Sequence, residues 1–490
     1  MRITLLCFAA FIFVKSVFSQ QFETFDKYFV DKTLRIDYYH IGDAKDEFVT
    51  IDQIYRYGIW AGSRVHLIDN FNYGRYYVKI IDAASGEIIY TKGFDSYFGE
   101  YKTSQPAING VKKTFQESAI IPSPKNKIFF TLYMRDKTNS LNEFFRAEID
   151  PESVNIRNDD LSDQSIKIFE SENNGDPHTR VDVAILAEGY TNLEKEKFRK
   201  DLAYFTNVFF EPDPYKSNEK KFNIYGVFKP SAESGVDEPR ANIFKNTVLN
   251  CTFNSMDSER YLLTEDNKSL RDIAANVPYD AIYIMVNSSR YGGGGIYNFY
   301  CTFTSDNQWK DYVFLHEFGH SFVGLADEYY TSSTAYNDFY PLGVEPTEAN
   351  ITALLDPSKL KWNKLKSEGI EIPTPWEKTG YDAMDNMWQS ERSELNDKIA
   401  QLKREKAPQQ EILKAIQQYD LKDKIHSEEV DSYLEKSKFA GMVGAFEGAG
   451  YSSQGLYRPM LDCIMFSKGN KPFCKVCEQA AREMIDSYTE

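Results

Sequence analysis

Positive charge is scarce in this chain of 490 residues, which has 57 lysines and arginines against 73 aspartates and glutamates. The net charge of −16 argues against a nucleic-acid partner, because phosphate binding needs a clustered positive surface. After the first 19 residues, no apolar run approaches the length of a transmembrane segment, so none is expected. Histidine is also rare, with six residues, whereas 33 tyrosines and 35 phenylalanines favour β-structure.

The first 19 residues have the pattern of a secretory signal peptide. Arg2 supplies a positive start, Leu5–Val14 form a short apolar run, and Val17 and Ser19 are small enough for a cleavage site before Gln20. The alternative is an N-terminal membrane anchor, although the run is too short to span a bilayer. We therefore expect a secreted or periplasmic protein.

The cysteines after this segment number five, and in an exported protein they can pair. We expect one bridge between Cys251 and Cys301, and a second from Cys463 to either Cys474 or Cys477, which leaves one thiol over. The last two cysteines also have zinc-ribbon spacing, but no second pair of this kind exists to complete four ligands. A structural zinc is therefore not expected there.

The expected fold class is α+β, with several domains. Residues 20–154 consist of short strand-like runs between Gly, Asn, Asp and Ser clusters, which predicts an antiparallel β-sandwich. Residues 155–177 are polar and indicate a linker. Residues 178–490 alternate strand and helix patterns, as expected of a twisted sheet with helices on it.

An insertion at 389–436 carries two helical stretches separated by Pro408, in surroundings rich in Lys, Glu and Gln. This pattern predicts two exposed antiparallel helices. One hypothesis is a partner-binding arm. The other, which we favour, is a hairpin packed on the edge of the domain.

The strongest chemical signal is His316-Glu317-x-x-His320, within an apolar helical pattern. Residues four apart lie on one face of a helix, so both imidazoles can reach the same metal ion. Glu317 then lies beside the metal, where it can act as general base toward a zinc-activated water. The alternative is a pair of structural histidines, but burying imidazoles without partners costs free energy.

A catalytic zinc has three protein ligands and an open position, so a third ligand is needed. Gly324 can end the helix and turn the chain back, which makes Asp327 the expected ligand and Glu328 the alternative. A thermolysin-like layout would instead use Glu345 or Glu348. Two prolines and a glycine interrupt that region, which disfavours the helix such a layout requires.

His316–Asp327 resembles the extended zinc motif of metzincin peptidases, with Asp in place of the usual third His and one extra residue before it. That departure, with Asp-Glu-Tyr at 327–329, resembles the IgA-peptidase-like metallopeptidase family of secreted bacterial proteins. Further segments that resemble this family are Glu188–Thr191, Tyr291–Asn298, Phe446–Tyr451, Tyr457–Pro459 and Cys463–Met465. The resemblance covers about 178–380 and 440–485. The N-terminal unit is similar to the family's accessory domain, whereas the helical insertion is not matched.

The resemblance implies roles for three of these segments. The glycine-rich strand would bind an extended substrate backbone, unless it is only a loose turn. Met465 would form the apolar floor beneath the metal, in the methionine turn, or else be an ordinary core methionine. Tyr457 would donate a hydrogen bond to the developing oxyanion, or else be a buried structural tyrosine. The strand contains four glycines: Gly292, Gly293, Gly294 and Gly295.

The function predicted from the sequence is a secreted, metzincin-like zinc endopeptidase that requires Zn²⁺ and acts on a protein or peptide. The alternative is a catalytically silent, metal-containing module that binds glycans or proteins at a surface. Neither the two histidines, nor the glutamate, nor the candidate third ligand is damaged in the sequence, which favours the enzyme.

Overall fold

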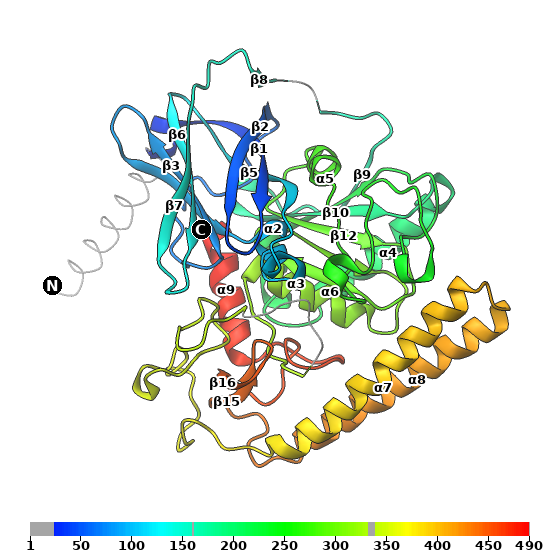
Figure 1. Cartoon of the computed structure of the whole chain (residues 1–490). Coiled ribbons are helices and arrows are strands. Elements are labelled where there is room, and N and C mark those ends of the chain that lie inside the picture. Colours follow the sequence, from blue (N-terminus) through cyan, green and yellow to red (C-terminus); the bar gives the residue numbers. More distant parts are fainter. Residues whose placement is uncertain (1–23, 159–160, 332–338, 490) are drawn as a thin grey trace, which may run out of the picture.

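The computed structural model describes residues 24–158, 161–331 and 339–489. The predicted signal peptide, residues 1–19, therefore lies outside the described residues. N-terminal strands, coloured blue to cyan in Figure 1, pack against a second region of strands and helices, coloured green to red. None of the helices in the described ranges is both long enough and apolar enough to cross a membrane.

The N-terminal region contains two four-stranded sheets. The first has the spatial order β5 (Lys113–Pro124), β1 (Phe29–Gly42), β2 (Glu47–Tyr57) and β8 (Ile156–Arg157). The second has the order β4 (Ile88–Phe94), β3 (Tyr76–Asp82), β6 (Ile128–Arg135) and β7 (Leu141–Ile149). Alternate apolar residues of both sheets, such as Ile36, Ile80 and Phe130, are buried in one shared core. Two short helices, α2 (Tyr97–Tyr101) and α3 (Gln105–Ile108), follow β4.

The second region is built on a six-stranded sheet whose four central strands are parallel. Its spatial order is β13 (Gly293–Ile296), β14 (Tyr300–Thr304), β12 (Ala281–Val286), β10 (Val181–Glu188), β11 (Phe222–Phe228) and β9 (Lys167–Glu172). The outer strands β13 and β9 are antiparallel to their neighbours. Every residue of β10 and β12 is buried, which is expected where both faces of a parallel sheet are covered. The expectation of a multi-domain α+β chain is confirmed.

Helices cover both faces of this sheet. One face packs against α4 (Lys195–Phe209), α6 (Lys310–Phe318) and α9 (Lys475–Thr489). The other face packs against α5 (Asn267–Ala274) and against aromatic residues of the N-terminal region, among them Phe98 and Phe115. The N-terminal sheets are therefore a fixed part of the structure around the second region.

The structure corrects the expectation that the segment 155–177 is a linker. Strand β9 lies within it and pairs with β11 as the edge of the six-stranded sheet. An edge strand needs only backbone hydrogen bonds on one side, so the polar sequence Lys167–Glu172 is compatible with it. Polarity alone did not reveal this strand.

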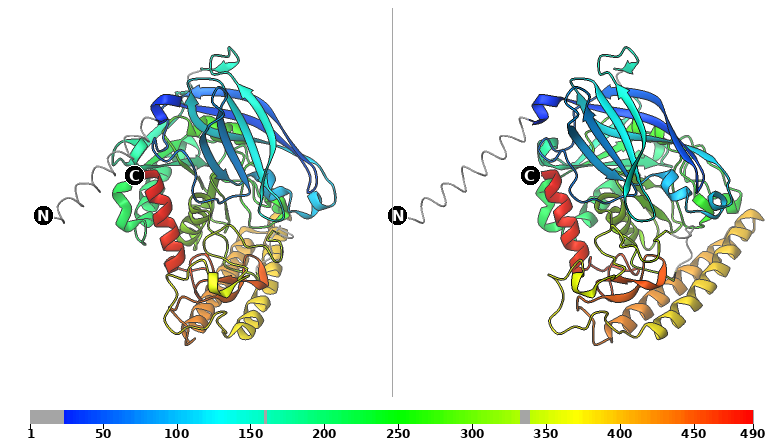
Figure 2. Two further views of the ribbon diagram at one scale, coloured as in Figure 1. Left: turned by 90° about the vertical axis from the view of Figure 1, so that its left-hand side faces the viewer. Right: turned by 60° about the vertical axis from the view of Figure 1, so that its left-hand side comes forward.

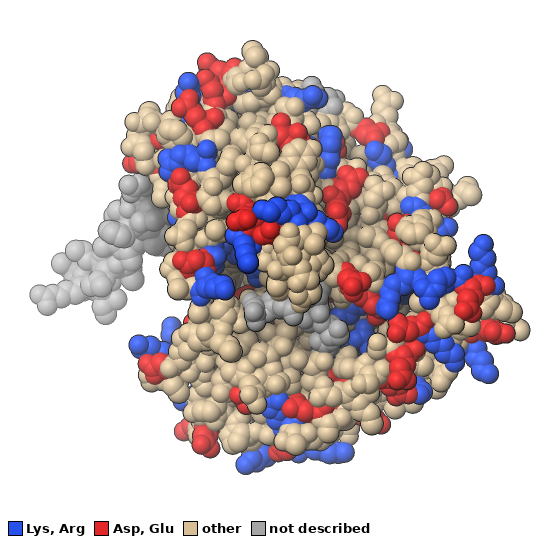
Figure 3. Space-filling model, viewed as in Figure 1, with Lys and Arg blue, Asp and Glu red and all other residues tan. Residues whose placement is uncertain are grey.

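The insertion forms two long antiparallel helices, α7 (Lys378–Arg404) and α8 (Gln409–Glu435), which begin before the predicted residue 389. They run side by side along their length (Figure 2), and basic and acidic side chains alternate over them (Figure 3). Lys403 pairs with Glu238 at 2.7 Å, and Asp423 accepts a hydrogen bond from the indole of Trp309 at 2.7 Å. The hairpin therefore packs on the edge of the second region. A small hairpin, β15 (Phe446–Ala449) and β16 (Ser452–Arg458), follows it.

The five described cysteines are free and buried. Cys251 and Cys301 lie in cores on opposite faces of the six-stranded sheet, so the bridge expected between them is wrong. The sheet itself separates the two sulfurs. The expected bridge from Cys463 to Cys474 or Cys477 is also not formed, although these three residues lie together.

Candidate active site

The two candidate metal-binding histidines lie on one continuous helical segment. His316 is in the last turn of α6, and His320 is in a π-helical turn, Gly319–Val323, that continues the helix. The segment ends at Gly324, whose φ of +73° is strained for any residue with a Cβ atom. The expected helix end at Gly324 is therefore present, and the chain turns back there.

This turn brings a carboxylate to the histidines. The Oδ1 atom of Asp327 lies 3.1 Å from Nε2 of His316 and 3.2 Å from Nε2 of His320. The two Nε2 atoms are themselves 3.1 Å apart. Three potential ligand atoms thus form a nearly equilateral triangle.

The remaining nitrogens of the rings fix their orientation. Nδ1 of His316 lies 2.9 Å from the carbonyl oxygen of Ile464, and Nδ1 of His320 lies 2.6 Å from that of Leu325. A carbonyl oxygen can only accept, so each Nδ1 carries the proton. When such a ring is neutral, its Nε2 atom has a free lone pair directed at the triangle, as metal-binding histidines require.

The size of the triangle fits a metal ion. Zinc binds histidine nitrogens at about 2.0–2.1 Å, so two ligand atoms of a tetrahedral site are about 3.3–3.4 Å apart. The observed separations of 3.1–3.2 Å are close to this. His316, His320 and Asp327 could therefore hold one divalent ion with a fourth position open to the cavity.

Burial and the attraction between opposite charges set the pKa values of the ionisable groups in this site. Burial lowers the pKa of His320, but the Asp327 carboxylate outweighs it and raises the pKa to about 9. Burial acts to raise the pKa of Asp327, yet the two histidines hold it well below the usual range. Burial raises the pKa of Glu317. Asp327 is thus an anion ready to bind a cation, and Glu317 is a stronger base than an exposed glutamate.

Glu317 faces the same cavity, of about 90 Å³, as both histidines and Asp327. The glycines of β13 allow this close approach. A Cβ atom on Gly293 would lie 3.0 Å from Oε1 of Glu317, and one on Gly295 would lie 2.5 Å from its backbone oxygen. These two glycines face the cavity, whereas a Cβ on Gly292 or Gly294 would meet Phe253 or Leu263 instead.

The outer edge of β13 is partly occupied. Gly293 forms a parallel bridge with Tyr261, and its carbonyl oxygen accepts a hydrogen bond from the backbone N–H of Leu262 at 3.2 Å. A substrate strand that paired along all of Gly292–Gly295 would have to displace this contact. The stretch around Gly295 is the part beside the metal-binding triangle.

Met465 lies beneath the helical segment, where a Cβ atom on Gly319 would come within 2.9 Å of its sulfur. The carbonyl oxygen of Met465 also accepts a hydrogen bond from the backbone N–H of Glu328 at 2.8 Å. The predicted methionine turn therefore supports both the helix and the loop that carries Asp327.

Tyr457 is not among the residues that line the cavity, and its backbone pairs with Thr352 and Glu447. Other tyrosines line the cavity, and one of them, Tyr451, contacts a candidate metal ligand. The hydroxyl of Tyr451 donates a hydrogen bond to Oδ2 of Asp327 at 2.6 Å. Tyr451 belongs to the segment Phe446–Tyr451, which resembled the family, so the sequence contained a signal for it.

The other carboxylates considered as ligands have different partners. Glu328 is fully buried and directed at cysteines rather than at the histidines. Glu345 pairs with Lys361 at 3.1 Å, and Glu348 accepts a hydrogen bond from Tyr340 at 3.1 Å. The structure brings only Asp327, of these candidates, to the histidine nitrogens.

Two further features of the cavity were not predicted. Arg260 lines it and donates a hydrogen bond to the hydroxyl of Tyr329 at 2.8 Å. The N-terminal region also contributes to the wall, through Gly74, Asp95 and Glu100. No local sequence pattern links these residues to the histidines, because the fold alone brings them together.

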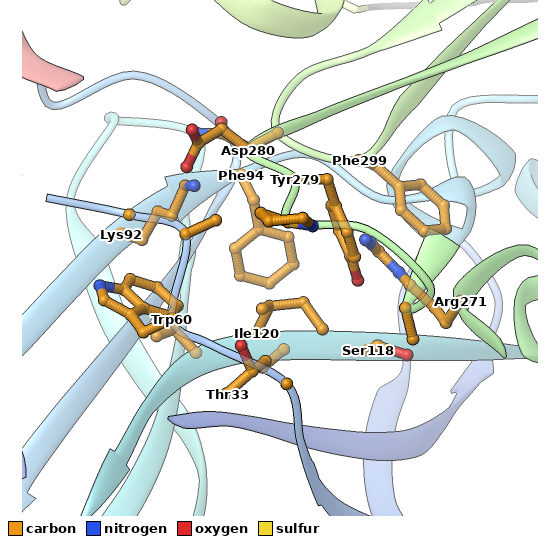
Figure 4. A pocket seen from close by; sticks show the side chains of 18 of the residues that line it. Thr33, Trp60, Lys92, Phe94, Ser118, Ile120, Arg271, Tyr279, Asp280 and Phe299 are labelled. Atoms are coloured by element: carbon orange, nitrogen blue, oxygen red, sulfur yellow. The ribbon is translucent and has the colours of Figure 1, made fainter. Parts of the chain in front are cut away.

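A larger cavity of about 200 Å³ lies between the N-terminal sheets and the second region. Figure 4 shows Trp60 and Phe94 on one side of it and Arg271 and Tyr279 on the other. It contains neither a candidate metal ligand nor Glu317. The candidate active site is therefore chosen by the chemistry of the residues that line a cavity and not by the volume of the cavity.

Two histidines and a buried carboxylate around one metal-sized space, with a second carboxylate beside them, are characteristic of metal-dependent hydrolases. Residues 169–485 match the family described as IgA Peptidase M64, and residues 24–146 match that described as Peptidase M64 N-terminus. This chain therefore belongs to the IgA peptidase M64 family, and its family identifies it as a metallopeptidase with a protein substrate. A comparison with curated proteins found no match.

Proposed function

We propose that this protein is an exported, metzincin-like zinc endopeptidase in which Glu317 is the general base. The observation that carries the proposal is the triangle of His316, His320 and Asp327, which opens onto the cavity lined by Glu317. Zn²⁺ bound there supplies a Lewis acid and lowers the pKa of the attacking water. We further propose that the two N-terminal sheets form a β-sandwich.

Glu317 does the proton chemistry in this proposal. Its carboxylate accepts the proton of the attacking water and passes it to the leaving amine nitrogen as the peptide bond breaks. Burial raises its pKa, which strengthens it as a base. Nδ1–H bonds to Ile464 and Leu325 hold the two imidazoles, and Tyr451 holds Asp327.

The substrate is an extended stretch of polypeptide that crosses the cavity beside Gly295. A glycine here lets a second backbone approach the helical segment, since a Cβ would already meet Glu317. The cavity walls from the N-terminal region then contact the same substrate. Cleavage is therefore expected in unfolded chains or exposed loops, which can adopt an extended form.

The test is digestion of a peptide library by the purified protein and by Glu317→Gln. We expect the variant to keep its zinc and to lose cleavage by about 100-fold or more, the usual contribution of a general base. Glu348→Gln is the matched control, because Glu348 lines the same cavity but is bonded to Tyr340. Undiminished cleavage by Glu317→Gln would disprove the assigned base. A wild-type protein that binds zinc but cleaves no peptide would favour the silent binding module.

Export is tested separately. If residues 1–19 are a signal peptide, the protein recovered outside the cytoplasm begins at Gln20. N-terminal sequencing of the exported protein checks this. A chain that still begins at Met1 and stays with the membrane would favour the N-terminal anchor.

A further inference from the structure

A second cluster of potential metal ligands lies outside the cavity. Glu328, Cys463, Cys474 and Cys477 are all buried, and each offers one ligand atom within 4.8 Å of the others. The Sγ atoms of Cys463 and Cys477 are 3.9 Å apart. Oε1 of Glu328 lies 3.2 Å from Sγ of Cys477 and 3.8 Å from Sγ of Cys474. Four soft or anionic donors therefore converge on one point.

These separations are those of a tetrahedral zinc site. Zinc binds thiolate sulfur at about 2.3 Å, which places two sulfurs of a tetrahedron about 3.8 Å apart and a sulfur about 3.6 Å from a carboxylate oxygen. The observed distances of 3.9, 3.8 and 3.2 Å scatter around these values. A disulfide would instead need two sulfurs at about 2.05 Å.

Backbone N–H groups point at two sulfurs of the cluster. They donate from Cys474 to Cys463 at 3.1 Å, from Met465 to Cys463 at 3.4 Å and from Cys477 to Cys474 at 3.5 Å. Such N–H donors stabilise negative charge on sulfur. The positive end of α9 is also close, because Cys474 immediately precedes its first residue.

The carboxylate in the cluster is a second, independent indication of a metal site. Glu328 has no exposed surface, and its Oε2 atom is buried without a hydrogen-bond partner. Leaving such an oxygen unpaired costs free energy, and a bound metal ion would remove this cost. Asn350 donates to Oε1 at 3.1 Å and so orients the group toward the sulfurs.

We propose that Cys463, Cys474, Cys477 and Glu328 bind a second, structural Zn²⁺. The four protein ligands fill the coordination of the ion and the site is buried, so it has no position for substrate. It is separate from the histidine site and does not depend on the proposed catalytic function. The sequence argued against zinc here because the fourth ligand is Glu328, far along the chain from the cysteines.

The position of this ion gives it a role in holding the active site. Glu328 follows Asp327, and Cys463 precedes Ile464, whose carbonyl oxygen orients His316. Cys474 immediately precedes α9 and Cys477 lies in its first turn, and this helix packs on the sheet. The ion therefore joins three segments, two of which hold ligands of the first site in place.

The experiment measures metals in the purified full chain by mass spectrometry. We expect two zinc ions per chain in the parent and one in the double variant His316→Ala/His320→Ala. Cobalt replaces zinc as a probe, since thiolate-bound Co²⁺ shows strong sulfur-to-metal absorption in the near ultraviolet. This absorption should persist in the histidine double variant and disappear in Cys474→Ala. Cys251→Ala, which removes a buried cysteine outside the cluster, should retain both metals.

Two results would overturn the proposal. One is a parent protein without the sulfur-to-cobalt absorption and with no zinc left after the histidines are replaced. The other is a non-reduced peptide map in which Cys463 is covalently joined to Cys474 or Cys477. Both are measured on folded protein with these cysteines intact, so they do not depend on whether a cysteine variant folds. A second zinc in a protein without peptidase activity would support this proposal and contradict only the catalytic one.

Discussion

Asp327 and Glu328 are neighbours in the chain, yet their carboxylates belong to different clusters. Oδ1 of Asp327 lies 3.1 Å from Nε2 of His316, whereas Oε1 of Glu328 lies 3.2 Å from Sγ of Cys477. The two residues lie outside the helices and strands, and the backbone N–H of Glu328 is held by the carbonyl oxygen of Met465 at 2.8 Å. A substitution at either position therefore tests a different cluster.

Asp327→Ala removes one corner of the histidine triangle. We expect the variant to lose the ion bound there. Cleavage should fall by more than the roughly 10- to 100-fold that is typical when only a hydrogen bond to a metal ligand is lost. Metal content and peptide cleavage, measured on the same sample, check this. If the variant kept both its zinc at the histidines and its activity, Asp327 would not be the third ligand.

Tyr451→Phe removes the hydroxyl group, and with it the hydrogen bond to Oδ2 of Asp327, while the aromatic ring stays in place. We expect zinc affinity or activity to fall about 10- to 100-fold, as for other groups that orient a metal ligand. Tyr457→Phe is the matched control, because Tyr457 does not line the cavity. The reverse result, with only Tyr457→Phe impaired, would instead support the oxyanion role considered for Tyr457.

Gly295→Ala and Gly294→Ala should differ, although the residues are adjacent. The new Cβ at Gly295 would lie 2.5 Å from the backbone oxygen of Glu317, whereas that at Gly294 would meet a methyl group of Leu263 at 2.7 Å. A side chain can move more easily than a helix backbone. We expect Gly295→Ala to lower kcat/KM at least tenfold more than Gly294→Ala. Equal effects would mean that contact with the helix is unimportant.

A buried carboxyl pair should make stability depend on pH. Burial, followed by repulsion from Asp280, raises the pKa of Asp182 to about 8, and burial also raises that of Asp280. Between about pH 4 and pH 8 the folded chain then holds protons that the unfolded chain has released. The free energy of unfolding therefore falls as pH rises through this range, by up to about 1.4 kcal/mol per pH unit for each group.

Asp182→Asn provides the control, since an amide can still accept the hydrogen bond that Asn223 donates at 2.9 Å. We expect this variant to be more stable than the parent at pH 8 and to lose part of the slope. Urea unfolding at pH 5, 6, 7 and 8 measures both. A parent whose stability rises from pH 5 to pH 8 would contradict the shifted pKa values.

Local patterns predicted the parts of the site that are close together in the sequence. Helical periodicity placed His316 and His320 on one face, and Gly324 predicted the turn that returns Asp327 to them. Edge strand β9 was missed, because its side chains are polar and only its backbone joins the sheet. Tyr451 was inside a recognised segment, but its role depends on a contact that the sequence does not specify.

The cysteines show more clearly that local sequence patterns do not predict contacts made by the tertiary fold. Their number and expected export favoured disulfides, yet Cys251 and Cys301 lie on opposite faces of a sheet. The cluster around Cys463 gains its fourth member from Glu328, which only the tertiary fold brings near. Spacing rules detect ligands that are close in sequence, and they miss a site assembled from three distant segments.

The N-terminal region contributes Asp95 and Glu100 to the wall of the proposed catalytic cavity. Selection for a new target protein can therefore act on this region while the metal-binding helix stays unchanged. Two members of such a family could share every residue of the chemistry and still prefer different targets, with the distinction encoded in a part of the chain that performs none of the hydrolysis.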